Sequence, residues 1–226
     1  MRLYYFEGSP NLDDIYRILE EKISENQGVV HREYVPEIKR DIKTVIKDIK
    51  KYRDIAGISG NIVFEEIRRI PQIDGVQYVP QAVESDFFFL EGSTYFIPFC
   101  QKFDAEAVAF RMNTVLGDQY QVKNQRITTA GIERFLLDNP FSYRVCNWAR
   151  LTIPGIESSR LAGPNITQSS EFRTFERLGE KNYVMIQLVQ NGWVLGISES
   201  GIVVFYTQIT KENAIQFINQ KLIPLL

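Results

Sequence analysis

The chain has 226 residues, a hydrophobic content of 44% and a formal net charge of −2. These values are typical of a folded globular protein, and they argue against a disordered chain or a generally basic polyanion-binding domain. The longest apolar runs, such as residues 87–90, are far shorter than the ~20 residues of a membrane helix. The N-terminus does not have the pattern of a signal peptide, so we expect a cytoplasmic protein without a membrane partner.

The first half of the chain begins with a predicted strand at residues 2–6 and a helix that Ser9 caps and that stops near Gly28. A second helix is predicted at 36–54, after Pro36, because apolar residues recur at helical spacing from Ile38 to Tyr52. The other elements predicted for this half are a strand at 62–70, a hairpin at 86–100 and a helix at 104–116.

The second half is predicted to repeat this order, beginning with a helix at 129–138 that Thr128 caps. Residues 158–181 are rich in Ser, Gly, Asn and charge, which predicts a long loop. The other predicted elements are strands at 142–153, 183–190, 193–198 and 202–207, and a helix at 210–222 that Thr210 caps.

Two stretches, residues 90–117 and 196–223, follow the same order of strand, turn, strand and acidic-capped helix. An offset of 106 superposes them without a gap and places Phe205 on Phe99, Glu212 on Glu106 and Asn219 on Asn113. A shorter echo relates residues 70–74 to residues 153–157 at a spacing of 83. We therefore predict an α+β fold with a pseudo-duplicated, twisted antiparallel sheet that helices cover on one side. The predicted parts are an N-terminal strand–helix extension at 1–35, a first half at 36–118 and a second half at 119–226.

This tandem arrangement resembles the TATA-binding-protein-like fold, most closely in ESGIVVFYTQITKENAIQFINQKLI at residues 199–223. In that family a glycine turn also leads into a strand and a capped helix with an acidic residue near its start. The resemblance implies one curved sheet built from both halves, with helices on the convex side and often nucleic acid on the concave side. The DNA-kinking phenylalanine pairs of the family have no aligned counterpart here, so the resemblance gives shape and not function.

No sequence motif typical of catalysis is present. The one histidine, His31, lies in a polar stretch, and there is no CxxC, HExxH, P-loop or dinucleotide-binding motif. Adjacent acidic residues diverge on a helix or strand, so they do not form a carboxylate cluster; the pairs are Asp13–Asp14, Glu20–Glu21 and Glu65–Glu66. We predict no enzymatic activity, no cofactor and no metal, and we expect Cys100 and Cys146 to be free thiols.

The strongest local signal is the basic segment from Lys39 to Arg53, where seven basic residues and two acidic residues give a charge of +5. Four lysines recur in it at steps of four, four and three, and on a helix they would form a stripe able to follow a phosphate backbone. A solvated surface or a site for an acidic protein fits the same pattern.

The predicted loop at 158–181 combines four basic residues with Phe172 and Phe175, which suits single-stranded nucleic acid. An ordinary loop whose two phenylalanines pack on the sheet is the alternative. The predicted nucleic-acid-binding residues are Lys39, Arg40, Lys43, Lys47, Lys50, Lys51, Arg160, Arg173, Arg177 and Lys181.

The leading hypothesis is a non-catalytic accessory subunit or adaptor of a nucleic-acid-handling complex with a protein partner. A prokaryotic defence system with an Argonaute-type effector is one setting, although no residue points to it. Phe87, Phe88 and Phe89 are predicted to form an exposed protein-docking surface. The alternatives are a pure protein–protein interaction module and, third, a metal-dependent nuclease.

Overall fold

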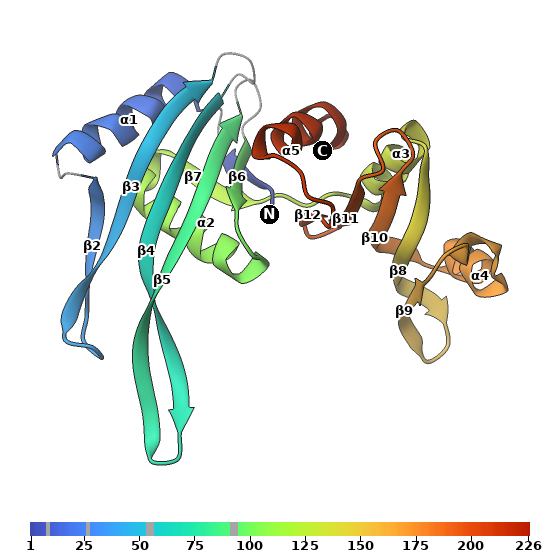
Figure 1. Ribbon diagram of the computed structural model, residues 1–226. Coiled ribbons are helices and arrows are strands. Elements are labelled where there is room, and N and C mark those ends of the chain that lie inside the picture. Colours follow the sequence, from blue (N-terminus) through green and yellow to red (C-terminus); the bar gives the residue numbers. More distant parts are fainter. Residues whose placement is uncertain (8–9, 26–27, 53–56, 91–94) are drawn as a thin grey trace. The chain divides into compact units, whose positions relative to one another are not determined.

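The computed structural model describes the chain except residues 8–9, 26–27, 53–56 and 91–94, and except the side chains of Lys102, Phe103 and Asp118 (Figure 1). The fold is α+β, and the chain forms two compact units, residues 1–123 and residues 124–226. Each unit has its own antiparallel sheet.

Unit 1 contains a seven-stranded sheet in the order β2-β3-β4-β5-β6-β1-β7. Its strands are β1 Tyr4–Glu7, β2 Val29–Val35, β3 Arg40–Tyr52, β4 Gly57–Gln72, β5 Gly75–Leu90, β6 Tyr95–Phe99 and β7 Gln121–Asn124. Its helices are α1 Leu12–Glu25 and α2 Lys102–Leu116, and a short 3-10 turn, Gly117–Gln119, follows α2.

The core of unit 1 joins its two helices to the sheet. Ile15 of α1 and Met112 of α2 are fully buried in one cluster with Ile62, Phe87 and Phe96 of the strands. Apolar residues spaced three and four apart place one face of each helix on this cluster.

The predicted first helix is confirmed as α1, while its predicted cap, Ser9, lies outside the described residues. Beyond its end, Gly28 adopts a left-handed conformation with φ 85° and donates its N–H to the carbonyl of Ile23. This conformation favours glycine, because a Cβ would be strained there.

The predicted helix at 36–54 is wrong, because this segment forms β3. Ile42, Thr44 and Ile46 are buried, whereas Asp41 and Lys43 are exposed, which is the alternation of a strand. β3 is rich in β-branched residues and pairs with β2 on one side and β4 on the other.

The strands β4 and β5 form one long hairpin, which pairs Gly57 with Leu90 at one end and Gln72 with Gly75 at the other. The pairing of β4 with β3 ends at Phe64. Residues 66–81 therefore extend beyond the rest of the sheet as a two-stranded projection, here called the arm (Figure 1).

Unit 2 contains a five-stranded sheet in the order β12-β11-β10-β8-β9. Its strands are β8 Phe141–Ile153, β9 Ile156–Ala162, β10 Glu180–Leu188, β11 Val194–Ser198 and β12 Val203–Phe205. Its helices are α3 Thr129–Asp138, α4 Ser170–Leu178 and α5 Lys211–Phe217, with a 3-10 turn at Ile166–Gln168. A π-helical turn, Ile218–Leu222, and a 3-10 turn, Ile223–Leu225, follow α5.

Both predicted threonine caps in unit 2 are confirmed. The side chain of Thr128 accepts the N–H of Gly131 at the start of α3, and Thr210 accepts the N–H of Asn213 at the start of α5. These caps satisfy backbone donors that the first turn of a helix leaves unpaired.

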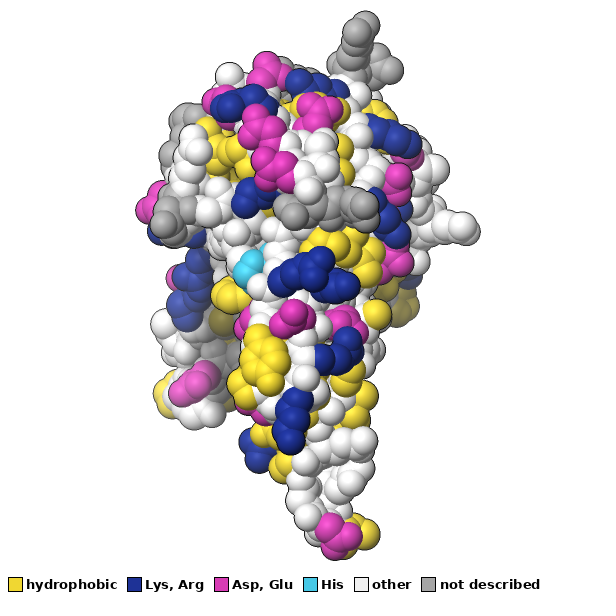
Figure 2. Space-filling view, turned by 90° about the vertical axis from the view of Figure 1, so that its left-hand side faces the viewer, with side chains coloured by type: hydrophobic (Ala, Val, Ile, Leu, Met, Phe, Trp, Pro, Cys, Tyr) yellow, Lys and Arg dark blue, Asp and Glu magenta, His cyan; other side chains and the backbone are white. Residues whose placement is uncertain are grey.

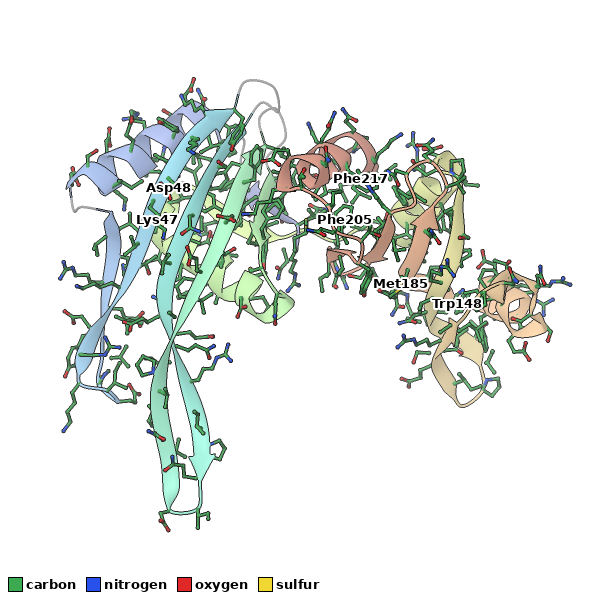
Figure 3. All side chains as sticks on the ribbon, viewed as in Figure 1. Lys47, Asp48, Trp148, Met185, Phe205 and Phe217 are labelled. Carbon is green, nitrogen blue, oxygen red and sulfur yellow. The ribbon has the colours of Figure 1, made fainter. Side chains whose placement is uncertain are left out.

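The predicted loop at 158–181 is wrong, since most of it is the end of β9 and all of α4. The hydroxyl of Ser169 accepts the N–H of Phe172 and caps α4. Phe172 packs against Trp148 with ring centroids 5.2 Å apart, and Figure 3 shows Trp148 beside this helix. The Phe175 ring also lies against Trp148, with centroids 5.6 Å apart. The alternative is therefore correct in that both phenylalanines pack on the sheet.

The two hairpins that suggested a duplication differ in register. Phe99 pairs with Asp86 in unit 1, so an offset of 106 would place Phe205 opposite Gly192. Phe205 instead pairs with Leu195, three positions away. An odd shift in register exchanges the two faces of a strand, so the gap-free alignment does not superpose these ladders.

Candidate nucleic-acid interface

Ion pairs neutralise three of the six predicted basic residues in unit 1. Lys47 Nζ lies 3.2 Å from a carboxylate oxygen of Glu84, and Arg40 lies 2.6 Å from Glu65. Lys51 Nζ is 2.6 Å from Asp13. Exposed pairs of this kind add little stability, but they reduce the positive field that a phosphate would meet.

Lys39, Lys43 and Lys50 are exposed and have no ion pair in the part of the chain that the structure describes. Lys39 lies in the turn before β3 with φ 52°, and not on a helix face. Figure 2 shows Lys and Arg side chains interspersed with Asp and Glu on the face of the molecule that it views. The ion pairs of Arg40, Lys47 and Lys51 therefore interrupt the predicted basic stripe. Unit 1 as a whole has 16 basic and 20 acidic residues.

Lys181 of unit 2 is only 4% exposed, so it is not an available phosphate contact. Its ammonium lies 3.5 Å from Glu133 of α3 and also hydrogen-bonds to Glu176 of α4. A buried charge needs such partners to offset its loss of hydration. Lys181 therefore ties α3 and α4 to β10.

The remaining predicted residues in unit 2, Arg160, Arg173 and Arg177, are exposed and have no ion pair among the described side chains. Arg173 and Arg177 are four residues apart on α4, so they lie on one side of that helix. Unit 2 has ten basic and eight acidic residues, a net charge of +2, against −4 in unit 1. The more basic part of the chain is therefore unit 2.

Another arginine of unit 2, Arg150, is held in an ionic cluster. It has φ 52° at the irregularity of β8, and its guanidinium lies 2.6 Å from Glu180 and 3.2 Å from Glu199. Arg126 approaches the same Glu199 at 3.8 Å. Both arginines are thus committed to contacts within unit 2.

The expectation that Phe87, Phe88 and Phe89 are exposed is wrong, because their exposed fractions are 1%, 2% and 0%. They lie on β5, between β4 and β6. The Phe89 ring packs against Phe96 with centroids 5.0 Å apart. Three consecutive apolar residues on an inner strand fit a position that is covered on both faces.

The exposed apolar side chains of unit 1 gather instead on the arm. Ile73 at its turn is 103% exposed and Ile70 is 44% exposed, while Val76 and Tyr78 are each 39% exposed. The sequence signal for this surface is the run IPQIDGVQYVP, which has too few polar residues for an ordinary turn.

Two tyrosines of unit 2, which the sequence analysis did not single out, lie in contact on its sheet. The hydroxyl groups of Tyr183 and Tyr206 are 3.0 Å apart. Burial is the main cause that raises the pKa of Tyr183, and the hydrogen bond to Tyr206 raises it further. The positive charge of Arg160 acts in the opposite direction. The alternation of Tyr183, Met185 and Gln187 along β10 is the sequence signal that marks this face.

The described part of the chain shows few other reactive side chains. Within the described ranges, no group of three or more His, Cys, Asp or Glu side chains could hold a metal ion. Cys100 and Cys146 are free thiols, as predicted, and burial raises the pKa of both. Among the helices that are described, none has the length and apolar composition needed to cross a bilayer.

The sequence matches no protein-family model, and comparison with curated proteins finds no match.

Proposed function

We propose that this chain is a non-catalytic accessory subunit of a nucleic-acid-handling complex, and that unit 2 makes the nucleic-acid contact. The observation that carries the proposal is the unequal charge: Arg160, Arg173 and Arg177 project from a unit of charge +2 without ion pairs among the described residues. Each phosphate contact by such a side chain releases condensed counterions, which favours binding at low salt.

A charge-reversal experiment distinguishes unit 2 from the lysines of β3. The first variant carries Arg160→Glu, Arg173→Glu and Arg177→Glu, and the matched variant carries Lys39→Glu, Lys43→Glu and Lys50→Glu. The measurement is fluorescence anisotropy with labelled 20-nucleotide single-stranded and duplex DNA. We expect the first variant to bind at least about tenfold more weakly and the second to change little. The opposite pattern would move the contact to unit 1, and no binding by the unaltered protein would refute the function.

This proposal includes the prediction that helices cover one side of the sheet in unit 2. The contacts of α3, α4 and α5 reach Lys181, Trp148 and Phe205, whose positions in the ladder place them on one face of the sheet. The other face would then be open to a ligand. The pseudo-duplication, the resemblance to the TATA-binding-protein-like fold and the defence setting stay predictions.

The arm favours a second candidate function, a protein-interaction module. Pro71 is opposite Val76, and Pro80 is opposite Ile67. Hydrogen-bonded and non-hydrogen-bonded pairs alternate along a hairpin, and the pair next to a two-residue turn is hydrogen-bonded. Both prolines therefore lie in non-hydrogen-bonded pairs. Each proline therefore presents its ring to the free edge of the arm, where an added strand would need an N–H donor. The arm is thus suited to packing through its apolar side chains and not to extension of the sheet.

A pull-down from native cell extract, with and without nuclease, tests this second candidate. Under the accessory-subunit proposal a partner and nuclease-sensitive nucleic acid are recovered together. If nuclease treatment does not change the recovery of a protein partner, and the Ile73→Asp variant no longer recovers it, the interaction module is favoured. The matched control is Gln77→Asp, which places the same charge on the arm without removing an apolar side chain.

A further inference from the structure

One face of the sheet in unit 2 carries a row of polar and aromatic side chains. The cross-strand pairs align Arg160 of β9, Asn147 of β8, Tyr183 of β10 and Ser198 of β11. Neighbouring strands are about 4.8 Å apart, so the row is about 14 Å long. Paired residues project from the same side of a sheet, so these four side chains share one face.

The next row on this face has no polar side chain. It consists of Ala162, Val145, Met185, Gly196 and Val204. Neither row contains a carboxylate, and Arg144 reaches this face through its hydrogen bond to Gln187. A ligand here would meet arginine at two places and no acidic side chain within the two rows.

Gly196 allows the Tyr183 ring to lie across β11. A Cβ at position 196 would be 2.6 Å from the Tyr183 hydroxyl and 3.1 Å from the ring carbon that bears it. The ring thus lies over the backbone of Gly196, and its hydroxyl reaches that of Tyr206 at 3.0 Å. Tyr206 is 54% exposed, so part of its ring is open to a ligand.

A polar group on the same face is without a partner. The side-chain oxygen of Asn147, between Arg160 and Tyr183 in the first row, is buried and accepts no hydrogen bond from any group that the structure describes. An unpaired buried acceptor is unfavourable, and a donor from a base would relieve it after a small side-chain movement.

We propose that this face binds single-stranded nucleic acid by stacking bases on Tyr183 and Tyr206, while Arg160 and Arg144 contact phosphates. The inference rests on the function proposed above and adds the site and the form of the ligand. Aromatic rings on an open sheet with neighbouring arginines suit unpaired bases, whose flat faces are free to stack. A duplex keeps its bases stacked on one another, so it cannot use the tyrosines in this way.

The test compares two substitutions of the exposed tyrosine. Tyr206→Phe keeps the ring, whereas Tyr206→Leu keeps an apolar side chain but removes the stacking surface. The probes are fluorescein-labelled 15-nucleotide single strands of DNA and RNA and a duplex of the same sequence. Because one base stack is worth roughly 1–3 kcal/mol, we expect the leucine variant to bind single strands about 5- to 150-fold more weakly. We expect the phenylalanine variant to bind like the unaltered protein.

The controls separate this inference from the broader function. Tyr34→Leu removes a tyrosine of unit 1 that is 60% exposed, and it should leave binding unchanged. Equal thermal unfolding midpoints for the two Tyr206 variants would show that both fold. If the leucine variant binds single strands normally, or duplex binds as tightly, this site is refuted while the proposed function stands. If the unaltered protein binds none of the probes, both are refuted.

Discussion

Lys47 and Lys50 are three residues apart in the chain, yet they lie on the same face of the sheet in unit 1. Lys47 is opposite Asn61 and Lys50 is opposite Ser59, because a β-bulge at Asp48 places two residues of β3 opposite one of β4 (Figure 3). Asp48 adopts φ 56°. The extra residue changes an odd step in sequence into an even step in the ladder.

The bulge makes a prediction about Asp48. Replacement by valine should lower the free energy of unfolding by about 1–2 kcal/mol, because a β-branched residue is strained in the left-handed region. Replacement by glycine removes the strain and should change it by less than about 1 kcal/mol. Urea unfolding followed by circular dichroism measures both changes. Tryptophan fluorescence would not, because Trp148 and Trp193 both lie in unit 2 and Asp48 lies in unit 1. Lys43→Val, at a regular strand position, is the control, and equal losses for the two Asp48 variants would contradict the assignment.

This bulge also explains why the sequence predicted that the lysines share one side but did not predict that they lie on a strand. A step of four residues returns to the same side of both a helix and a strand, so Lys43 and Lys47 fit either one. The step of three to Lys50 favours a helix unless a bulge intervenes. Pairing with β2 and β4 decides for the strand, and no pattern within β3 itself contains that information.

Local chemistry was more predictable than tertiary burial. Thr128 and Thr210 cap helices through contacts within three residues, so the sequence is sufficient to predict them. The burial of Lys181 depends on Glu133, which is 48 positions away in the chain, and on the packing of α3. The sheet face that holds Tyr183 depends on the registers of β8, β10 and β11, which join residues far apart in the chain.

Phe89 and Ile73 should differ strongly in their effect on stability. Phe89 is fully buried, so Phe89→Ala should reduce the free energy of unfolding by about 3–5 kcal/mol. Ile73 is 103% exposed at the end of the arm, so Ile73→Ala should change it by no more than about 0.5 kcal/mol. Urea titrations of the two variants measure the difference. A large loss for Ile73→Ala would show that the arm is packed against something in the free protein.

Lys181 should be more sensitive to loss of its partners than to its own replacement. Glu133→Gln with Glu176→Gln leaves a buried ammonium without a counter-charge and should destabilise unit 2 by about 2 kcal/mol or more. Lys181→Met retains an unbranched apolar side chain and removes the charge, so it should be less damaging. Tryptophan fluorescence during urea unfolding follows unit 2 directly. A larger loss for Lys181→Met than for the double variant would contradict the role assigned to the ion pairs.

The two thiols should react at different rates. Burial raises the pKa of Cys146 to about 12, so almost none of it is thiolate at pH 8. Cys100 is only half-buried. Titration with a disulfide reagent should detect at most one slowly reacting thiol in the native protein and two in denaturant. Rapid reaction of both native thiols would contradict the burial of Cys146.

The same pKa shift predicts a dependence of stability on pH. As pH rises above the ordinary thiol value of 9, the unfolded state releases the proton of Cys146 while the folded state retains it. The contribution of this group to the free energy of unfolding is therefore complete below pH 9 and decreases between pH 9 and about 12. Cys146→Ala should remove this part of the slope in urea unfolding measured across that range. An unchanged slope would place the titration elsewhere.

The most direct test of nucleic-acid contact is the salt dependence of binding to a single-stranded oligonucleotide. Two or three phosphate contacts by the arginines of unit 2 predict that affinity falls about 7- to 20-fold between 50 and 200 mM salt. The same titration with Arg160→Gln should show a shallower slope. Binding that ignores salt, or no binding at 50 mM, would contradict the account.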